Sequence, residues 1–324
     1  MEKLLTVSVA AYNVAEYIRG TLDSVIHPDC IDAMEILVVD DGGTDETLSI
    51  VKEYEEKYPN SVFGIHKENG GYGSVINTTI RRATGKYFKQ LDGDDWFETE
   101  NLPAFLELLR SIDADYVVTP MRMVNEEDGS KVIRDYFENI QEGTYPFDEM
   151  DFRKISPMHC SCFRTKLLQE HNITITEHCF YTDVELVNRP VPYLNSICIC
   201  HLPIYVYRVG REGQSVSKTG VRKHYQEHER VFWNLLEIYR SLPADQVAKR
   251  QFIRQRLVKE TAVQMKYYCY LERGKGPHNE LKAFGSRLKQ EAPELLEAAM
   301  AYSRFAWLMV KSKYFFYHFS GLLL

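Results

Sequence analysis

The stretch K-Q-L-D-G-D-D-W, residues 89–96, places three aspartates directly behind a short apolar run. Residues 86–88, Lys-Tyr-Phe, precede it and have the character of a strand that enters a core. Asp92, Asp94 and Asp95 fall within four positions, and carboxylates this close repel one another and raise each other's pKa. Such a concentration of negative charge at the end of a buried strand requires a physical explanation.

Segments with strand and helix character alternate on both sides of this stretch. Short apolar runs predict strands, and apolar residues spaced by three to four predict helices. This alternation predicts a mostly parallel sheet with helices on both faces, in which ligands bind outside the carboxyl ends of the strands. Both acidic clusters, Asp40-Asp41 and Asp92 to Asp95, follow predicted strands. The expected strands are 4–10, 34–39, 61–66, 86–91 and 116–121, and the expected helices are 14–26, 44–57, 74–83 and 102–112.

The length of 324 residues favours two domains, because single hydrophobic cores rarely grow this large. The alternation loosens after residue 122, a polar loop is expected over 210–220, and helical spacing dominates from Val221 onward. We therefore expect an α/β domain over 1–220, which contains both acidic strand ends. A smaller helical domain is expected over 221–324.

Charge and cysteine usage limit the partners and the compartment. A formal net charge of -7 and a pI of about 5.9 imply no broad basic surface, so nucleic acid is not an expected partner. The seven cysteines are an odd number, and Met1 is not followed by a secretory apolar run, which predicts a cytoplasmic protein. No apolar stretch reaches the roughly 18 residues that a membrane span needs.

Two glycine-rich turns bear on nucleotide binding. The turn D-D-G-G-T-D-E, 40–46, is a poor phosphate cradle because carboxylates surround it, although aspartate can accept from a base or a ribose hydroxyl. The turn N-G-G-Y-G-S-V-I, 69–76, lacks the third glycine of a dinucleotide fingerprint, since Ile76 stands there. No G-K-[ST] motif is present, which excludes a P-loop.

A divalent cation would explain the acidic strand end. Alternate side chains of a strand share a face, so Asp92 and Asp94 point the same way if the extended conformation persists through Gly93. Mg²⁺ or Mn²⁺ takes carboxylate oxygens, keeps substrate phosphates as further ligands, and removes the repulsion between the carboxylates. The alternative is a polar turn that caps the helix expected near Asn101. The position at a strand carboxyl end favours the metal.

Several motifs occur together in one order. These are V-S-V-A-A-Y-N (7–13), E-I-L-V-V-D-D-G-G-T-D-E-T (35–47), N-G-G-Y-G-S-V-I-N (69–77), G-K-Y-F-K-Q-L-D-G-D-D-W (85–96), Y-T-D-V-E-L (181–186) and Y-V-Y-R (205–208). Over about two thirds of the chain this order resembles the family-two glycosyltransferases, inverting enzymes of the GT-A fold. The resemblance implies a Rossmann-like, mostly parallel sheet and transfer of a sugar from a nucleotide-diphosphate donor. It implies that domain 1–220 binds the nucleotide sugar and carries catalysis, which leaves acceptor binding, self-association or contact with a membrane surface as the expected role of 221–324.

The resemblance also implies roles for individual residues. Asp41 would hold the base, typically uracil; Asp92 and Asp94 match the D-x-D that handles ribose and metal-diphosphate; Asp95 is an alternative metal ligand; and Asp183 matches the catalytic base. Residues that would line the donor site elsewhere are Ala11, Tyr12, Asn13, Gly71, Gly93 and Arg208. The family usually has other residues at Ala10, Ala11, Gly43 and Thr182, which bears on the contacts to base and acceptor.

For the other candidate site residues, two interpretations each are open. Glu177 is a second candidate base or an acceptor ligand, and His159 either contacts the acceptor or the diphosphate or is a buried, satisfied histidine. Arg208, with Arg211 and Lys218, either closes over the donor diphosphate or belongs to a solvated connector. The spacing of the Cys and His residues on strands does not favour a zinc site.

These features predict a metal-dependent inverting glycosyltransferase that uses a nucleotide-diphosphate sugar, expected to be a UDP-sugar, in surface polysaccharide or glycoconjugate synthesis. The acceptor is expected to be a carbohydrate or a lipid-linked glycan. The aromatic segment 302–324 either packs on the protein or a partner subunit, as in a homo-oligomer, or lies in the membrane interface at the inner face. The rival functions are a sugar nucleotidyltransferase and a non-catalytic sugar-nucleotide binding module.

Overall fold

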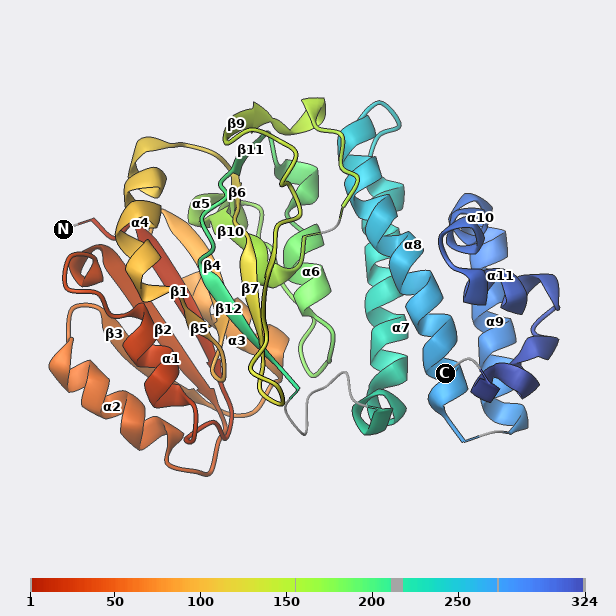
Figure 1. The fold of residues 1–324 in the computed structure, drawn as a ribbon, viewed down its shortest axis with the longest axis horizontal. Coiled ribbons are helices and arrows are strands. Elements are labelled where there is room, and N and C mark those ends of the chain that lie inside the picture. Colours follow the sequence, from red (N-terminus) through yellow and green to blue (C-terminus); the bar gives the residue numbers. More distant parts are fainter. Residues whose placement is uncertain (1, 155, 211–217, 273, 323–324) are drawn as a thin grey trace. The chain divides into compact units, whose positions relative to one another are not determined.

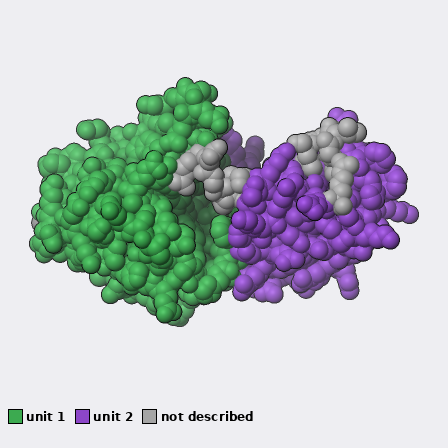
Figure 2. Space-filling model, turned by 90° about the horizontal axis from the view of Figure 1, so that it is seen from below, with its two compact units in different colours: residues 1–150, 156–211 green, residues 151–155, 212–324 purple. Residues whose placement is uncertain are grey.

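The computed structural model describes residues 2–154, 156–210, 218–272 and 274–322. The chain divides into two compact units, which are coloured separately in Figure 2. Unit 1 comprises residues 1–150 and 156–211, and unit 2 comprises residues 151–155 and 212–324. The functional division proposed at residue 220 stays a prediction. Helix α7 begins at Lys218, so the last residues of the expected loop 210–220 are helical, and residues 211–217 lie outside the described residues.

Unit 1 is built on an eight-stranded sheet (Figure 1) in the order β3-β2-β1-β4-β10-β6-β11-β9. The pairs β1–β2, β2–β3, β1–β4 and β6–β11 are parallel, whereas β10 runs antiparallel to β4 and β6, and β9 antiparallel to β11. The predicted mostly parallel sheet is therefore confirmed. The strands are β1 (Leu5–Ala11), β2 (Met34–Asp41), β3 (Val62–Lys67), β4 (Tyr87–Asp92), β6 (Tyr116–Val118), β9 (Gly143–Pro146), β10 (Ser161–Arg164) and β11 (Ser196–Ile199).

Strands β1 and β2 form the buried centre because their sequences are almost continuously apolar. Every residue of β2 is buried, as expected for a parallel strand that helices cover on both faces. Helices α1 and α2 pack on each other, and α3 packs on α5, so helices flank the sheet (Figure 1). The helices are α1 (Ile18–Val25), α2 (Thr47–Lys57), α3 (Tyr72–Arg82), α4 (Leu102–Ser111), α5 (Thr165–Glu170) and α6 (Asp183–Asn188).

A second sheet of four strands completes unit 1, in the order β5-β12-β7-β8. Its members are β5 (Trp96–Phe97), β7 (Met121–Asn125), β8 (Lys131–Arg134) and β12 (Tyr205–Val209). Strand β5 directly follows the acidic stretch, and its pairing with β12 brings residues 205–208 beside that stretch. Short 3-10 helices connect the elements: η1 (Ile31–Ala33), η2 (Thr99–Asn101), η3 (Phe147–Glu149), η4 (Met158–Cys160) and η5 (Val191–Tyr193).

Unit 2 is helical, as expected. Its elements are α7 (Lys218–Ser241), α8 (Val247–Tyr270), α9 (Lys275–Glu291), α10 (Pro293–Tyr302), α11 (Arg304–Lys311) and the 3-10 segment η6 (Phe315–Leu322). Helices α7 and α8 form an extended pair (Figure 1). Among the described residues, no helix combines the length and the hydropathy that crossing a bilayer would require.

A buried polar network joins α7 to α8. His228 lies with one ring nitrogen 2.6 Å from Gln264 Oε1 and the other 3.0 Å from Glu260 Oε2, and Arg256 donates to the second oxygen of Glu260. Burial alone raises the pKa of Glu260, but the hydrogen bond and charge of His228 together with Arg256 lower it to about 2. The carboxylate thus links two helices through charge-assisted hydrogen bonds.

We predict that Glu260→Gln destabilises unit 2 by about 2 kcal/mol at pH 7, because it removes the charge that buried His228 and Arg256 require. Because its folded pKa is depressed, Glu260 contributes stability above the unfolded pKa and loses it as pH falls toward 2. Urea unfolding at pH 7 and pH 3 measures both effects. The exposed Glu297→Gln is the control, and equal midpoints for the two variants at pH 7 would refute the network's role.

Candidate functional site

The acidic residues meet at the carboxyl edge of the large sheet. The parallel register pairs Ala11 with Asp40 and Ala10 with Asp92, so the end of β1 lies between the ends of β2 and β4. This arrangement confirms that both acidic clusters follow strand ends on one edge, where open α/β sheets bind ligands.

Asp41 organises the glycine-rich turn at the start of α3. Its Oδ1 accepts from Lys67 Nζ at 2.7 Å and from the Gly70 N–H at 3.0 Å, and its Oδ2 accepts from the Gly71 N–H at 2.8 Å. Gly71 adopts φ +80°, a left-handed conformation that favours glycine. Asp41 is 3% exposed. The carboxylate that was expected to hold the base therefore also shapes the turn beside it, and its contact with a base stays a prediction.

The loop after β1 is fixed by Asn13. Its backbone is left-handed at φ 53°, and its Oδ1 accepts from the Thr44 N–H at 2.8 Å and the Asp45 N–H at 3.3 Å. Ala11 is buried at the end of β1, whereas Tyr12 is 54% exposed. The Asn13 side chain thus joins the loop after β1 to the loop after β2. Tyr12, which lies between Ala11 and Asn13 in the sequence, is exposed to solvent.

The chain turns at Gly93, so the extended conformation assumed for Asp92 and Asp94 does not persist. Strand β4 ends at Asp92, and the Asp95 N–H donates to the Asp92 carbonyl at 3.1 Å across a tight turn. The Gly93 N–H donates to the Ala10 carbonyl at 2.9 Å, and a Cβ at position 93 would lie 2.6 Å from that oxygen. Gly93 is therefore required by close packing on β1, rather than by space between two carboxylates.

Asp95 points inward from this turn. Its Oδ2 accepts from the Tyr205 hydroxyl at 2.7 Å and its Oδ1 from the Arg208 N–H at 2.8 Å, and the residue is 2% exposed. Asp92 is partly exposed and accepts from the Tyr72 hydroxyl at 2.5 Å. Asp94 is also partly exposed. The three aspartates of the stretch thus differ in burial and in the donors that surround them.

Arg208 supports the same turn from β12. Its Nε donates to the Asp94 carbonyl at 2.8 Å, and its guanidinium pairs with Glu126. The guanidinium also lies 4.8 Å from the Trp96 ring centre and 5.0 Å from that of Tyr17. These contacts fix the turn, and the expected contact of Arg208 with a donor diphosphate stays a prediction. Lys218 begins α7 with its ammonium over the Tyr270 ring, and Arg211 lies outside the described residues.

The electrostatics of the turn are those of crowded carboxyls, of which Asp95 is buried. Burial, followed by the charge of Asp94, raises the pKa of Asp92 to about 7. Burial, followed by the charges of Asp92 and Asp94, raises the pKa of Asp95 to about 8. The same burial and negative charge raise the pKa of the Tyr72 and Tyr205 hydroxyls. The sequence-based expectation that these aspartates raise each other's pKa is therefore confirmed for two of them.

His159 completes a set of atoms that can hold a metal ion. Ligand atoms of Asp92, Asp95 and His159 lie within 4.8 Å of one another, and this is the one such group of three or more found among the described residues. The His159 ring lies against Tyr205 and Tyr207, with centroids 4.8 Å and 4.4 Å away. Its Nδ1 is buried without a hydrogen-bond partner in the described part of the chain.

Burial of the imidazole, with a buried lysine beside it, favours its neutral form. Lys89 is fully buried in β4, and its ammonium donates to the His159 carbonyl at 2.8 Å and the Ser161 carbonyl at 3.3 Å. Burial and the charge of Lys89 lower the pKa of His159 to about 3. Metal ions bind the neutral form of imidazole, so the protonation state and the unpartnered Nδ1 both suit a ligand role.

Asp183 faces this cluster from the start of α6. Its charge contributes to raising the pKa of Asp92, Tyr72 and Tyr207, which places its carboxylate within electrostatic reach of all three. The structure thus brings the two acidic elements of the predicted site together, although Asp183 lies 88 positions after Asp95 in the sequence. Tertiary structure alone supplies this proximity.

Glu185 is a residue of the site region that the sequence-based reasoning missed. It is 1% exposed, and its carboxylate accepts from the Thr176 N–H at 2.7 Å, from the Thr176 hydroxyl at 2.9 Å and from Arg189 at 2.8 Å. These bonds fasten α6, and with it Asp183, to the segment before it. The one sequence signal was the spacing of four between Glu185 and Arg189 on a helix.

Glu177 lies in the segment that Glu185 fastens. It is exposed, and its Oε1 accepts from Asn77 Nδ2 at 3.0 Å. The segment is further tied to the glycine turn, because the His178 N–H donates to the Gly70 carbonyl at 2.6 Å. A Cβ on Gly73 would lie 2.1 Å from the Thr176 carbonyl, so helix α3 must carry glycine at this position. The structure thus places Glu177 beside α3, and its role toward an acceptor stays a prediction.

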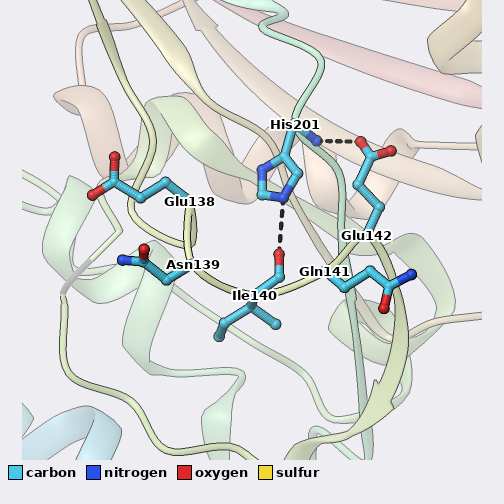
Figure 3. A pocket seen from close by; sticks show the side chains of 6 residues that line it. All are labelled: Glu138, Asn139, Ile140, Gln141, Glu142 and His201. Carbon is cyan, nitrogen blue, oxygen red and sulfur yellow. Dashed lines mark hydrogen bonds between the residues drawn. The ribbon is translucent and has the colours of Figure 1, made fainter.

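A separate open hollow lies beside His201, just after β11 (Figure 3). Its lining comes from residues 138–142 and His201, and no residue of the acidic turn belongs to it. The His201 ring lies 2.6 Å from Asp135 and 2.9 Å from the Ile140 carbonyl, so it pins the loop before β9 to the end of β11. These contacts are structural, and the acidic turn remains the better candidate site.

Comparison with known proteins identifies the family. The model of glycosyl transferase family 2 matches residues 6–172, which is more than half of the chain and includes the ends of β1, β2 and β4. The chain belongs to this family. The sequence-based resemblance is thereby confirmed.

Named relatives of this family 2 chain are much longer proteins. Glycosyltransferase GlyA of Streptococcus pneumoniae is 28% identical over 233 residues, which cover 68% of this chain and 32% of the relative. Poly(ribitol-phosphate) beta-N-acetylglucosaminyltransferase TarS of Staphylococcus aureus is 28% identical over 219 residues, covering 67% and 37%. The chain thus spans about a third of the length of each of these two relatives.

Solved structures share the fold over nearly the whole family 2 chain. TarS residues 1–349 in complex with UDP-GlcNAc match with a TM-score of 0.74 and 20% identity, covering 99% of this chain and 92% of that one. The mannosyltransferase PcManGT of Pyrobaculum calidifontis, in complex with GDP-Man and Mn²⁺, matches with a TM-score of 0.57 and 19% identity, covering 95% and 87%. At this identity the likeness shows the fold, which is the predicted GT-A type.

We predict that the protein without divalent ions loses stability as pH rises. Asp92 and Asp95 have folded pKa values of about 7 and 8, raised above the unfolded values, so their contribution is fully present below about pH 4 and is lost as pH rises through 7 and 8. Thermal unfolding in a chelator from pH 6 to pH 8.5 measures the loss, on the order of 1 kcal/mol or more.

Asp94→Asn is expected to flatten this pH dependence, because Asp94 contributes to both raised pKa values. The exposed Asp148→Asn is the matched control and should leave the profile unchanged. A wild-type midpoint that stays constant or rises over this range would contradict the crowded, buried state of the carboxyls.

Proposed function

We propose that this chain is an inverting glycosyltransferase that moves a sugar from a UDP-sugar to an acceptor hydroxyl in polysaccharide or glycoconjugate synthesis. The observation that carries the proposal is the group of buried carboxyls at the end of β4, faced by Asp183, in a chain of glycosyl transferase family 2. The choice of UDP is supported by TarS, the structural neighbour with UDP-GlcNAc bound. The proposed acceptor is a carbohydrate or a lipid-linked glycan.

The residues at the end of β4 fit a divalent cation, Mn²⁺ or Mg²⁺. Asp92, Asp94 and Asp95 would supply carboxylate oxygens, and His159 is placed to add a neutral nitrogen. The raised pKa values support this fit, because burial and neighbouring negative charges raise them and a bound cation would lower them. A bound divalent ion would neutralise the charge that develops on the departing nucleoside diphosphate.

In the proposed reaction the acceptor oxygen forms a bond to the anomeric carbon as the bond from that carbon to the diphosphate oxygen breaks. Attack from the opposite face inverts the anomeric centre. Asp183 takes the proton of the acceptor hydroxyl, and Glu185 holds α6 so that this carboxylate faces the turn. Asp183 is therefore the proposed catalytic residue, and Glu185 is a positioning residue.

The remaining donor and acceptor contacts are proposals of the same kind. Exposed Tyr12 beside Ala11 and Asn13 would stack on the base, and Asp41 Oδ2, which accepts one bond from Gly71, has a second lone pair for a base N–H. Gly93 and Arg208 would act mainly through the shape of the turn. Glu177 and His159 remain the acceptor candidates. Cytoplasmic location, the inner face of a membrane and self-association stay predictions.

The direct test is nucleoside diphosphate release from UDP-sugars with Mn²⁺ and an acceptor panel. We expect Asp183→Asn to lower kcat by about 10²- to 10⁴-fold, the range for loss of a general base, while UDP binding stays within about twofold. Exposed Asp148→Asn is the control and should retain full turnover.

Two outcomes would replace the proposal. Release of pyrophosphate would identify a sugar nucleotidyltransferase. Binding of UDP-sugars without turnover on any acceptor, by a wild-type protein that unfolds cooperatively, would identify a non-catalytic binding module. Equal turnover of wild type and Asp183→Asn would remove Asp183 from the mechanism.

A further inference from the structure

Helix α11 of unit 2 has one buried face and one exposed face. Phe305, Ala306 and Met309 are buried against the unit. Arg304, Trp307 and Lys311 are exposed, and their spacing of three and then four residues places them along a single helix face. Trp307 is 47% exposed although tryptophan is usually well covered in folded proteins. The outer face of this helix therefore carries an indole between two cations.

The segment η6, which follows α11 in the chain, also exposes large aromatic side chains. Phe315 is 63% exposed and Phe319 is 47% exposed, and their ring centroids lie 5.7 Å apart. Together with Trp307 and Tyr302, which is 62% exposed, they gather large uncovered rings into one short stretch of chain. We call Tyr302, Arg304, Trp307, Lys311, Lys313, Phe315 and Phe319 the aromatic–basic surface.

The outward direction of these rings is fixed by inward neighbours. Tyr317 is buried and stacks on His278 with centroids 5.1 Å apart, and His278 Nε2 lies 3.1 Å from the Tyr314 carbonyl. A Cβ on Gly285 would meet the Tyr314 hydroxyl at 1.7 Å, so α9 must carry glycine there to admit that ring. Tyr314 and Tyr317 thus anchor η6 to α9, and the exposed rings of Phe315 and Phe319 are not the result of a loose segment.

The charge of this region is opposite to that of the whole chain. The chain has a formal net charge of -7, yet residues 298–324 contain Arg304, Lys311 and Lys313 and no aspartate or glutamate. All three cations are exposed. A positive, aromatic surface on an acidic protein is complementary to an anionic surface with an apolar interior.

We propose that the aromatic–basic surface binds the interface of a bilayer that contains anionic phospholipids. Indole and phenyl rings are favoured at the depth of the headgroups, where one part of the ring meets hydrocarbon and another meets water. Lysine and arginine side chains on the same face reach the lipid phosphates while their aliphatic stems cover apolar area. The protein thus lies on the membrane through unit 2.

This inference deepens the proposed function, because a lipid-linked acceptor would be met at that surface. Only this link to a lipid-linked acceptor rests on the proposed function, whereas binding to the bilayer does not. The residues of the aromatic–basic surface belong to unit 2, whereas the acidic turn belongs to unit 1, so binding of vesicles and binding of UDP are measured on separate sets of residues.

The test is flotation of the full chain with vesicles of phosphatidylcholine, with and without phosphatidylglycerol. We expect the wild type to float with the phosphatidylglycerol vesicles and to be released by high salt, because surface electrostatic attraction is screened. The variant W307S/F315S/F319S should bind about tenfold more weakly to them. The variant K311E/K313E should lose the preference for anionic lipid.

Val247→Ser is the matched control, because Val247 is 68% exposed at the start of α8 but lies outside the aromatic–basic surface. Thermal stabilisation by UDP with Mn²⁺ should be the same in all variants that fold, which separates this test from that of the transferase. Equal flotation of wild type and the triple serine variant overturns the proposal. The proposal is also overturned if the wild-type protein floats with neither kind of vesicle. If the wild type instead forms a dimer that the serine variant lacks, the surface is an interface between copies.

Discussion

The repulsion among carboxyls at the end of β4 is the constraint on which the rest of the site depends. Asp92 and Asp95 are held in surroundings that favour their protonated forms, with Asp94 beside both. The protein supplies hydrogen-bond donors from Tyr72 and Tyr205, which orient the oxygens but bring no positive charge. Arg208, which donates to the Asp94 carbonyl, also pairs with Glu126. The crowding of these carboxyls is what the proposed divalent cation would relieve.

The fold maintains this unfavourable group by close backbone packing. The turn after Asp92 can press on β1 because residue 93 has no side chain, and the pairing of β5 with β12 brings Tyr205 beneath the turn. Buried Lys89, which lies on the same strand as Asp92, holds the backbone of His159 by a hydrogen bond to its carbonyl. Glu185 holds Asp183 in place indirectly, because its hydrogen bond from the Thr176 N–H fastens α6 to the segment before it. His159 and Asp183, two of the proposed site residues, are thus each held in place by a buried charged side chain.

The parts predicted from sequence were those with local signals. The apolar runs predicted β1, β2 and β4, and the acidic residues after them predicted the edge that carries the site. The condition under which Asp92 and Asp94 would share a face is not met, because the extended conformation ends where Gly93 packs on Ala10. The role of Arg208 and the contribution of Tyr205 depend on β12 pairing across the chain. Local patterns carry no information about such long-range pairing, and the same holds for the antiparallel β10 between β4 and β6.

The most direct measurement is the anomalous scattering of Mn²⁺ in crystals grown with UDP and MnCl₂. The account predicts one strong peak within bonding distance of carboxylate oxygens of the 92–95 turn, with the UDP diphosphate on its other side. His159 Nδ1 or Nε2 would be a further ligand if its neutral ring turns to the ion. Clear density for UDP with no manganese at the turn, or manganese bound only elsewhere, would contradict the claim that this cluster exists to hold a cation.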